Sequence, residues 1–283
     1  MEPQQKVIMH IVDRLKRRLQ KPNDADWMTL LANPDESVPP LPPREIQEHF
    51  CGLSGLRAMQ QAVAFYAAIR DFCKENGKPI QSMKAILDFG CGWGRITRCF
   101  LREVRTDVLF GCDVIPSMIE ICQKSIPSYH FVTNNALPPS PFGEETFDLI
   151  YAYSVFSHLS EDAHKSWLQE FHRILKPNGI MVLTTRPRYF IGNWPNLAYL
   201  PKIDVDQLLK EYDAGKFVHI PHSSSHNLSD SFFGETAIPS AYMKCVWPKW
   251  FDLRGFRGDV CHVDQNVVFL VKERLRPNVP FAN

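Results

Sequence analysis

The sequence predicts an α/β fold, a Rossmann-like and mostly parallel sheet with helices on both faces. Three observations support this prediction. From residue 84 onward, short apolar segments alternate with segments of helical spacing. The apolar segments are hydrophobic along their whole length, as expected for strands that are covered on both faces. A glycine-rich turn, "DFGCGWGR" (residues 88–95), directly follows the first apolar segment.

The strands and helices follow from the chain in order. Pro116 suits the first turn of a helix, and Ser160 is a typical helix N-cap. Right-handed crossovers between parallel strands place the carboxyl ends of these strands on one edge of the sheet, where ligands bind in such folds. The expected strands are 84–89, 107–114, 129–134, 147–156 and 180–186, and the expected helices between them are 94–104, 116–125 and 160–175.

The region before the sheet reads as a helical extension. We expect residues 1–80 to form an N-terminal helical cap and residues 81–283 to form the main domain. Residues 6–20 have apolar side chains at helical spacing and a basic opposite face, which favours a helix packed on its own domain or on a second copy; a membrane surface or a partner helix is the alternative. A proline-rich linker (33–43) and a second helix (53–76) follow. A homodimer would form through residues 1–50.

Composition narrows the classes of partner. The formal net charge is only +1, so the total charge does not call for nucleic acid. We find no apolar run of the roughly 18 residues that a membrane span needs, and no secretory signal at the start of the sequence. The 8 cysteines show no CxxC pair. We therefore expect a cytoplasmic protein with reduced thiols, without a nucleic-acid partner and without an integral membrane segment.

The glycine turn has a physical explanation. Gly90, Gly92 and Gly94 lack Cβ atoms, so the backbone can adopt positive φ and approach a ligand closely. Asp113 ends the second strand about 20 residues later, where a carboxylate can accept both hydroxyls of a ribose. The spacing is G-x-G-x-G, whereas a dinucleotide site would have G-x-G-x-x-G. The sequence thus predicts a site for a ribose-bearing ligand other than a dinucleotide.

These motifs carry a resemblance to a known family. "LDFGCGWGR" resembles motif I of class I S-adenosylmethionine-dependent methyltransferases, and "GCDVIPSMIEIC" resembles their ribose-binding segment. Residues 138–185 resemble the fourth-strand to fifth-strand region of the small-molecule type. The resemblance covers about residues 84–186. It implies S-adenosyl-L-methionine as cofactor, and a seven-stranded sheet whose last two strands (250–256 and 263–273) form an antiparallel hairpin.

The resemblance also implies roles for individual residues. Asp113 matches the ribose carboxylate. Asn134 or Asn135 would meet the adenine edge, since a side-chain amide is both donor and acceptor. Ser154 and Tyr153 fall at the end of the fourth strand, under the sulfonium and beside the acceptor. The remaining positions expected to bind the cofactor are Asp88, Gly90, Cys91, Gly92 and Gly94 around the methionine part, and Val114 and Ile115 against adenine.

His158 is the candidate catalytic residue. It follows the fourth strand in "SVFSHLS", in the region that faces the acceptor. Imidazole is well suited to remove a proton near neutral pH, which an alcohol or phenol acceptor requires. The alternative is a histidine that only shapes the pocket. The expected reaction is methyl transfer to a hydroxyl oxygen of a small molecule or glycan; a non-catalytic cofactor-binding scaffold and N-methylation of a small molecule or peptide are the alternatives.

A long aromatic-rich insertion, residues 187–247, separates the fifth strand from the final hairpin. Insertions of this length at a ligand-binding edge commonly form lids and substrate walls. We expect Trp194, His222 and Phe233 to contact the substrate together with Tyr153. His219, His222 and His226 raise the question of a metal site, but no helix aligns them and no cysteine lies nearby, so no metal is expected.

Overall fold

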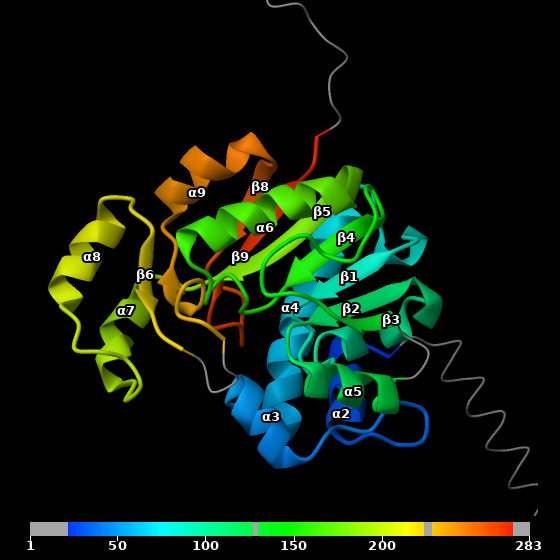
Figure 1. The fold of residues 1–283 in the computed structure, drawn as a ribbon. Coiled ribbons are helices and arrows are strands. Elements are labelled where there is room, and N and C mark those ends of the chain that lie inside the picture. The colour runs from blue at the N-terminus through cyan, green and yellow to red at the C-terminus, as the bar shows by residue number, and fades with distance from the viewer. Residues whose placement is uncertain (1–21, 127–129, 224–227, 274–283) are drawn as a thin grey trace, which may run out of the picture.

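A computed structural model describes residues 22–126, 130–223 and 228–273. Its sheet has seven strands in the order β3-β2-β1-β4-β5-β9-β8 (Figure 1). The first five are parallel, and β9 runs antiparallel to both β5 and β8. The fold class and the antiparallel hairpin are therefore confirmed. In sheet order the strands are His130–Thr133, Leu109–Asp113, Ile86–Phe89, Phe147–Ala152, Leu175–Thr185, Asn266–Val271 and Asp252–Arg257.

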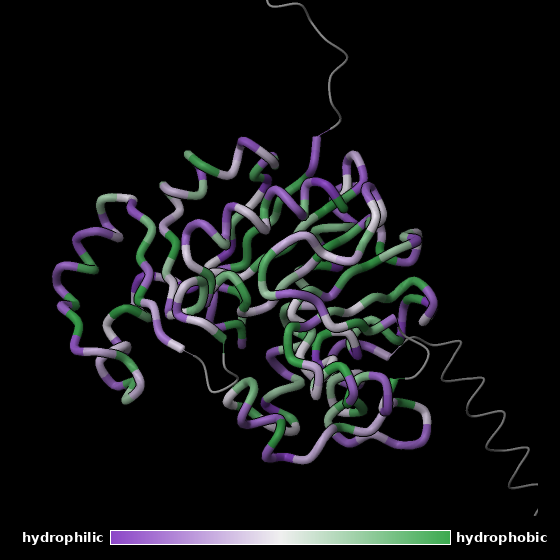
Figure 2. Tube along the Cα trace, in the orientation of Figure 1, coloured by the Kyte–Doolittle hydropathy of each residue, from purple (hydrophilic) through white to green (hydrophobic). Residues whose placement is uncertain are grey.

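Helices cover both faces of this sheet, because successive strand residues point to opposite sides. Ile180 and Val182 of β5 pack into the core below helix α4 (Gly55–Glu75), whereas Met181 and Leu183 pack against helix α6 (Glu161–Ile174). In Figure 2, hydrophobic positions accordingly recur along the central strands. Burial on both faces explains why these strands read as continuous apolar runs.

From residue 22 onward, three α-helices precede the sheet: α2 (Asp24–Ala32), α3 (Arg44–Cys51) and α4. The predicted helix 53–76 corresponds to α4, and the predicted linker 33–43 joins α2 to α3. The Trp27 indole donates a hydrogen bond to the carbonyl of Cys99 at 3.0 Å, and Phe72 stacks on Phe269 of β9 with ring centroids 4.4 Å apart. Residues 22–80 thus share a hydrophobic core with the sheet. The predicted helix 6–20 lies outside the described residues.

Two expected elements differ in the structure. Residues 94–104 do not form an α-helix: Gly92 and Gly94 adopt positive φ, and only a 3₁₀-helix, η2 (Thr97–Arg102), follows. The segment is buried, and the Arg98 guanidinium is bound to the carbonyl of Pro39, so packing overrides its helical spacing. In addition, β5 begins at Leu175, before the expected start at residue 180, and continues through the "KPNG" segment with Asn178 at φ 60°.

The other helices follow the expected connections. Helix α5 (Pro116–Ser125) begins at its proline, and the Ser160 hydroxyl caps α6 by accepting from the Ala163 backbone NH. Both predictions are confirmed. Short 3₁₀-helices are η1 (Ile80–Ser82), η3 (Thr106–Val108), η4 (Trp194–Asn196) and η5 (Trp247–Lys249).

The insertion between β5 and β8 forms a small sheet with short helices, separate from the main sheet. It comprises α7 (Tyr189–Asn193), η4, α8 (Val205–Asp213), a two-stranded sheet of β6 (Val218–Pro221) and β7 (Gly234–Ala237), and α9 (Ser240–Val246). In Figure 1, α7, α8 and β6 lie to the left of the main sheet. A bridge between Arg186 and Ala237 joins the beginning of this insertion to the end of β7.

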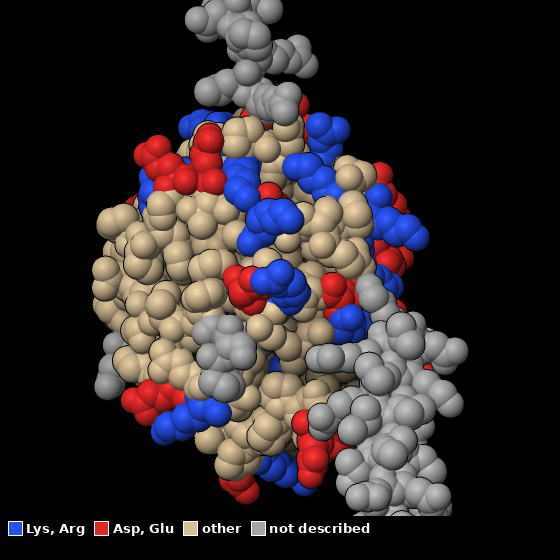
Figure 3. Space-filling model, turned by 90° about the vertical axis from the view of Figure 1, so that its right-hand side faces the viewer, with Lys and Arg blue, Asp and Glu red and all other residues tan. Residues whose placement is uncertain are grey.

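The surface carries charges of both signs. On the face seen in Figure 3, acidic and basic side chains are interspersed among uncharged ones. This mixture agrees with the near-zero net charge. Within the described residues, no helix combines the length and the hydropathy that a membrane crossing requires.

Candidate active site

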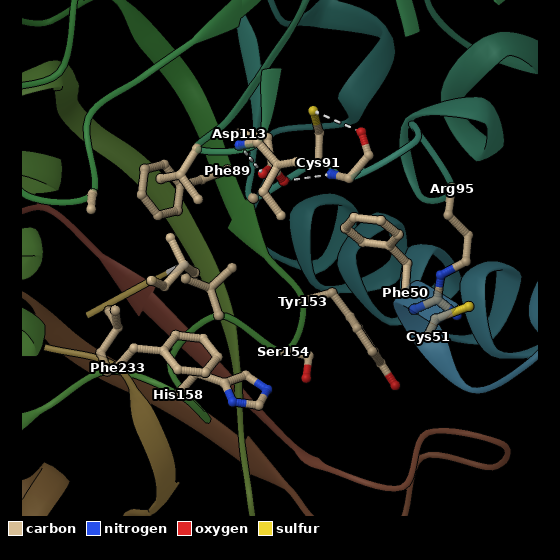
Figure 4. A pocket seen from close by; sticks show the side chains of 18 of the residues that line it. Phe50, Cys51, Phe89, Cys91, Arg95, Asp113, Tyr153, Ser154, His158 and Phe233 are labelled. Carbon is tan, nitrogen blue, oxygen red and sulfur yellow. Dashed lines mark hydrogen bonds between the residues drawn. The ribbon is translucent and has the colours of Figure 1, made fainter. Parts of the chain in front are cut away.

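A pocket of about 900 Å³ opens at the carboxyl ends of β1, β2 and β4. It is lined by the glycine turn, the end of α3, the insertion and the loop between β8 and β9. Figure 4 shows Asp113 and Cys91 at one end, His158 and Phe233 at another, and Tyr153 and Ser154 between them. This is the edge at which an open parallel sheet binds ligands.

The glycine turn requires its glycines. Gly90 has φ 71°, and a Cβ atom there would lie 2.3 Å from Cγ2 of Val155. The backbone NH groups of Gly90 and Cys91 both donate to the carbonyl of Cys112 on β2, at 2.8 and 3.0 Å. The turn is therefore held tightly against β2, and its open side faces the pocket.

Asp113 is held in one orientation by two backbone donors. Gly92 NH donates to Oδ2 at 2.8 Å, and Ile115 NH donates to Oδ1 at 3.0 Å. The carboxylate is 7% exposed and lines the pocket. Val114, Ile115 and Asn134 line the same end, and Oδ1 of Asn134 is buried with no hydrogen-bond partner in the described structure. An unsatisfied buried amide oxygen is costly, so a donor from a ligand would fit there.

Asp88 lies beneath the glycine turn and is almost fully buried. The Thr97 hydroxyl donates to its Oδ2 at 2.6 Å. Burial penalises the charged carboxylate and raises the pKa of Asp88 to about 7. Its protonation state therefore changes near neutral pH.

The end of β4 turns sharply into the pocket. Ser154 has φ 60°, and its backbone NH donates to the Thr184 hydroxyl at 2.7 Å. Gln265, from the β8–β9 loop, donates to the Ser154 Oγ at 2.9 Å. Tyr153 packs edge-on against Phe65 of α4. These contacts end the strand at Ala152, four residues before the end that the apolar run predicts.

His158 is fixed by three neighbours. Its Nδ1 lies 3.0 Å from the carbonyl oxygen of Gly234, so Nδ1–H is the donor and Nε2 carries the lone pair. The Arg186 guanidinium lies 3.3 Å from Nε2, and the Phe233 ring stacks on the imidazole. Burial, and then the charge of Arg186, lower the pKa of His158 well below its usual value. This environment differs from that of a free imidazole, on which the expectation of a base near neutral pH rests.

A buried ion pair lies next to His158. Arg186 follows β5 and pairs with Glu235 of β7, whose side chain is almost entirely inaccessible. The Tyr199 hydroxyl donates to Glu235 at 3.2 Å, and His222 Nε2 lies 3.4 Å from the same oxygen. Burial lowers the pKa of Arg186 to about 10.

The structure brings most of the predicted site residues together. Trp194 is an exception: it is 1% exposed and packs in the small core of the insertion with Ile191 and Val218, away from the pocket lining. Gly94 and Asn135 are also absent from the lining; a Cβ atom at Gly94 would lie 3.2 Å from Cys122 Sγ. The predicted residues that line the pocket are Asp88, Gly90, Cys91, Gly92, Asp113, Val114, Ile115, Asn134, Tyr153, Ser154, His158, His222 and Phe233.

Other lining residues were missed by sequence reasoning. Arg186 could have been found, because it directly follows the fifth predicted strand and so reaches the same edge. Glu235 and Asp264 carry no such signal, since they lie in an insertion and in a loop. The remaining missed residues include His49, Phe50 and Cys51 of α3 and Gln61 of α4.

The histidines of the insertion have other partners. His219 Nδ1 lies 2.8 Å from the Thr236 hydroxyl, and His222 Nδ1 lies 3.1 Å from the Ser223 carbonyl. His226 lies outside the described residues. In the described ranges, no group of three His, Cys, Asp or Glu side chains is arranged to hold a metal ion.

Comparison with known proteins agrees with this geometry. Residues 86–179 match the family model described as a methyltransferase domain. An uncharacterized methyltransferase of Synechocystis sp. is 31% identical over 115 residues, which are 40% of this chain and 52% of that protein. A malonyl-[acyl-carrier protein] O-methyltransferase of Halalkalibacterium halodurans is 29% identical over 107 residues, 36% of this chain and 39% of that one. A fatty-acid O-methyltransferase of Mycolicibacterium smegmatis is 32% identical over 114 residues, 39% of this chain and 40% of that one.

The chain spans about half the length, or less, of these curated relatives. Among solved structures, an S-adenosylmethionine-dependent methyltransferase from Mesorhizobium loti superposes with a TM-score of 0.51 at 14% identity, over 74% of this chain and 98% of that one. This likeness supports the fold. Residues 86–179, with their glycine turn and the carboxylate after β2, therefore match a methyltransferase domain in sequence, and the sheet around them has the fold of an S-adenosylmethionine-dependent methyltransferase.

Proposed function

We propose that the protein transfers a methyl group from S-adenosylmethionine to a small-molecule acceptor, on an oxygen atom. The observation that carries this proposal is the single pocket that joins Asp113 at one end to His158 at the other. The described residues fit the cofactor. Asp113 is oriented for a ribose diol, the glycine turn lets backbone approach a ligand, and Asn134 offers an unpaired acceptor for an adenine amino group.

The side chains at the acceptor end of the pocket support the proposal that the acceptor is a small molecule with an apolar part. Phe190, Phe232 and Phe233 line it together with Leu228, beside the polar groups of His158 and Glu235. A pocket of about 900 Å³ has room for a cofactor and a small acceptor together. Two of the relatives are named as O-methyltransferases, one of a fatty acid and one of a malonyl-[acyl-carrier protein]. Those names support oxygen as the acceptor atom here.

The chain's own residues account for the chemistry in three ways. A bound sulfonium cofactor supplies an electrophilic methyl group. The end of β4, with Tyr153 and Ser154, positions the two reactants, and proximity of this kind is a major source of rate. The insertion and α3 line the same pocket and would limit the access of water to it. The lone pair of His158 Nε2 takes up the proton that the acceptor hydroxyl loses. For this, the Arg186 guanidinium must first move away from Nε2.

Two other functions make different predictions. A non-catalytic scaffold would bind the cofactor without turning it over. N-methylation would place an amine next to the buried carboxylate of Glu235. The orienting contacts of His158 and the aromatic acceptor end favour catalysis on oxygen over both.

The test is an assay of S-adenosylhomocysteine release with the purified full chain. Acceptors are pooled by functional group: phenols, aliphatic alcohols, carboxylic acids and amines. Turnover with an oxygen acceptor supports the proposal. Cofactor binding without turnover in any pool favours the scaffold, and turnover with amines alone favours N-methylation.

A further inference from the structure

Two buried polar atoms near His158 have no hydrogen-bond partner among the described residues. They are Nε of Arg186, which is a donor, and Oε1 of Gln265, which is an acceptor. Both residues line the pocket; the Arg186 side chain is 11% exposed and Gln265 is 6% exposed. A buried donor or acceptor that is left unsatisfied costs free energy, so both atoms call for a ligand.

The sheet register brings these two residues together. The antiparallel ladder of β5 and β9 ends with Thr185 paired to Asn266. Arg186 and Gln265 are the residues just beyond this last pair. Cβ atoms of opposed residues in an antiparallel pair lie about 5 Å apart, so one ligand group can meet both side chains. That group has to accept from Arg186 Nε–H and donate to Gln265 Oε1, and a hydroxyl does both.

The edge of the guanidinium that carries Nε faces the candidate base. In arginine, Nε and Nη2 share one edge, as in Arg188, whose Nε and Nη2 both donate to Asp213 at 2.7 Å. In Arg186, Nη2 lies 3.3 Å from His158 Nε2, whereas Nη1 is bound to Glu235. The Nε–H therefore lies next to the lone pair that takes up the acceptor's proton. A hydroxyl bound at Nε is a close neighbour of the hydroxyl that reacts.

We infer that Arg186 Nε and Gln265 Oε1 form a subsite for a second hydroxyl group of the acceptor, on the carbon next to the one whose oxygen is methylated. The acceptor is thus a vicinal diol. This inference rests on the proposed function and names its substrate class. Gln265 also donates to Ser154 Oγ, so one amide connects the diol to the end of β4, which positions the reactants. The bound hydroxyl gives the guanidinium a partner other than His158, and proton uptake by His158 requires that the guanidinium leave Nε2.

The test compares acceptors that differ in the second oxygen. Phenol lacks it, 1,2-dihydroxybenzene has it, and 2-methoxyphenol has an oxygen that can accept from Arg186 but no hydrogen for Gln265. Cyclohexanol and cis-1,2-cyclohexanediol repeat the comparison without an aromatic ring. The methylation assay on the full chain measures kcat and KM for each acceptor with the parent, Gln265→Met and Gln207→Met. Gln207→Met is the matched control, because Gln207 is exposed on α8 and lies outside the pocket lining.

The parent should use at least one diol about 10- to 100-fold better, in kcat/KM, than the matching single alcohol or phenol, the effect of one or two added hydrogen bonds. Activity with 2-methoxyphenol should stay near that with phenol. Gln265→Met should lower kcat/KM for the preferred diol about 10-fold and change the singly hydroxylated acceptor by less than about threefold, so the preference collapses. Gln207→Met should match the parent.

A parent that turns over neither diol, or that prefers neither diol to its singly hydroxylated match, would overturn the inference, whether or not Gln265→Met folds. Equal losses on both kinds of acceptor in Gln265→Met would also overturn it, with a buried water as the partner of the two atoms. The proposed function fails separately, in the assay with pooled acceptors. Turnover of another oxygen acceptor there leaves the proposed function standing and removes only the diol, whereas no turnover with any oxygen acceptor contradicts both.

Discussion

The rings of His158 and Phe233 lie face to face, with centroids 5.0 Å apart and only 2° between their planes. Phe233 directly precedes Gly234, whose carbonyl accepts from His158 Nδ1. One short segment of the insertion therefore sets both the plane and the tautomer of the imidazole. The orientation of the candidate base depends on the insertion as well as on the strand that it follows.

His158→Ala should lower kcat by about 10² to 10⁴, the range for loss of a general base. S-adenosylhomocysteine affinity should stay near that of the parent, because the loss falls on the transition state. A base works in its unprotonated form, and the pKa of His158 is lowered. On acidification, parental kcat should therefore begin to decline only below the pH near 6.5 at which a free imidazole titrates.

The isosteric control is His158→Asn, which can still accept from Arg186. Near-parental kcat in this variant, with an unchanged pH profile, would assign His158 a purely shaping role. Positioning and desolvation would then be the main sources of rate.

Glu235→Gln should destabilise the protein by about 3 kcal/mol, since it leaves the Arg186 guanidinium buried without its counter-charge. The double variant Glu235→Gln/Arg186→Met removes both charges and should regain most of that loss. Urea unfolding at fixed pH measures the free energy of unfolding for all three proteins. A double variant less stable than Glu235→Gln would show that the pair does not act as a unit.

Asp88→Asn should gain stability relative to the parent as pH rises from 5 to 8. The pKa of folded Asp88 is raised to about 7, above the value near 4 in an unfolded chain. The folded state therefore binds the proton more tightly, and the parent loses stability as pH rises through this window. Melting temperatures of both proteins across the series measure the effect. A difference that does not vary with pH would contradict a raised pKa.

Asp113→Ala should weaken S-adenosylmethionine binding by about 1.5–3 kcal/mol, the scale of charged hydrogen bonds to a ribose. The variant also loses two backbone partners, Gly92 NH and Ile115 NH. Asp113→Asn keeps one side-chain oxygen that can accept from these NH groups. It therefore separates loss of the ribose contact from disorder of the glycine turn. Unchanged affinity in calorimetry for both variants would exclude a ribose contact.

Deletion of residues 1–76 should abolish turnover and folding together. The deletion removes α4, whose Phe65 contacts Tyr151 and Tyr153, and whose Phe72 stacks on Phe269 of the sheet. Loss of these buried aromatic contacts would expose the sheet to water. Circular dichroism and the methylation assay measure the two effects. A soluble, fully active truncated protein would show that the extension is peripheral.

The fold and the cofactor end of the pocket could be predicted because local signals define them. Gly90 and Asp113 lie at fixed distances from strands whose apolar runs are visible in the sequence. The acceptor end could not be predicted in the same way. Glu235 and Arg186 are 49 residues apart in the sequence. They pair only because the chain of the insertion folds back to the end of β5. Trp194 was misplaced because an aromatic residue in a lid can equally fill the lid's own core, as it does here.

The bridge between Arg186 and Ala237 has a consequence for protein engineering. The two ends of the segment from α7 to β7 lie side by side, and Ile191, Trp194 and Val218 give it a core of its own. Because its ends are adjacent, such a segment can be replaced by one of different length without moving the strands that flank it. Exchanging residues 187–232, while Arg186 and the segment 233–237 that orients His158 and pairs with Arg186 stay in place, should alter acceptor selectivity and leave cofactor affinity unchanged.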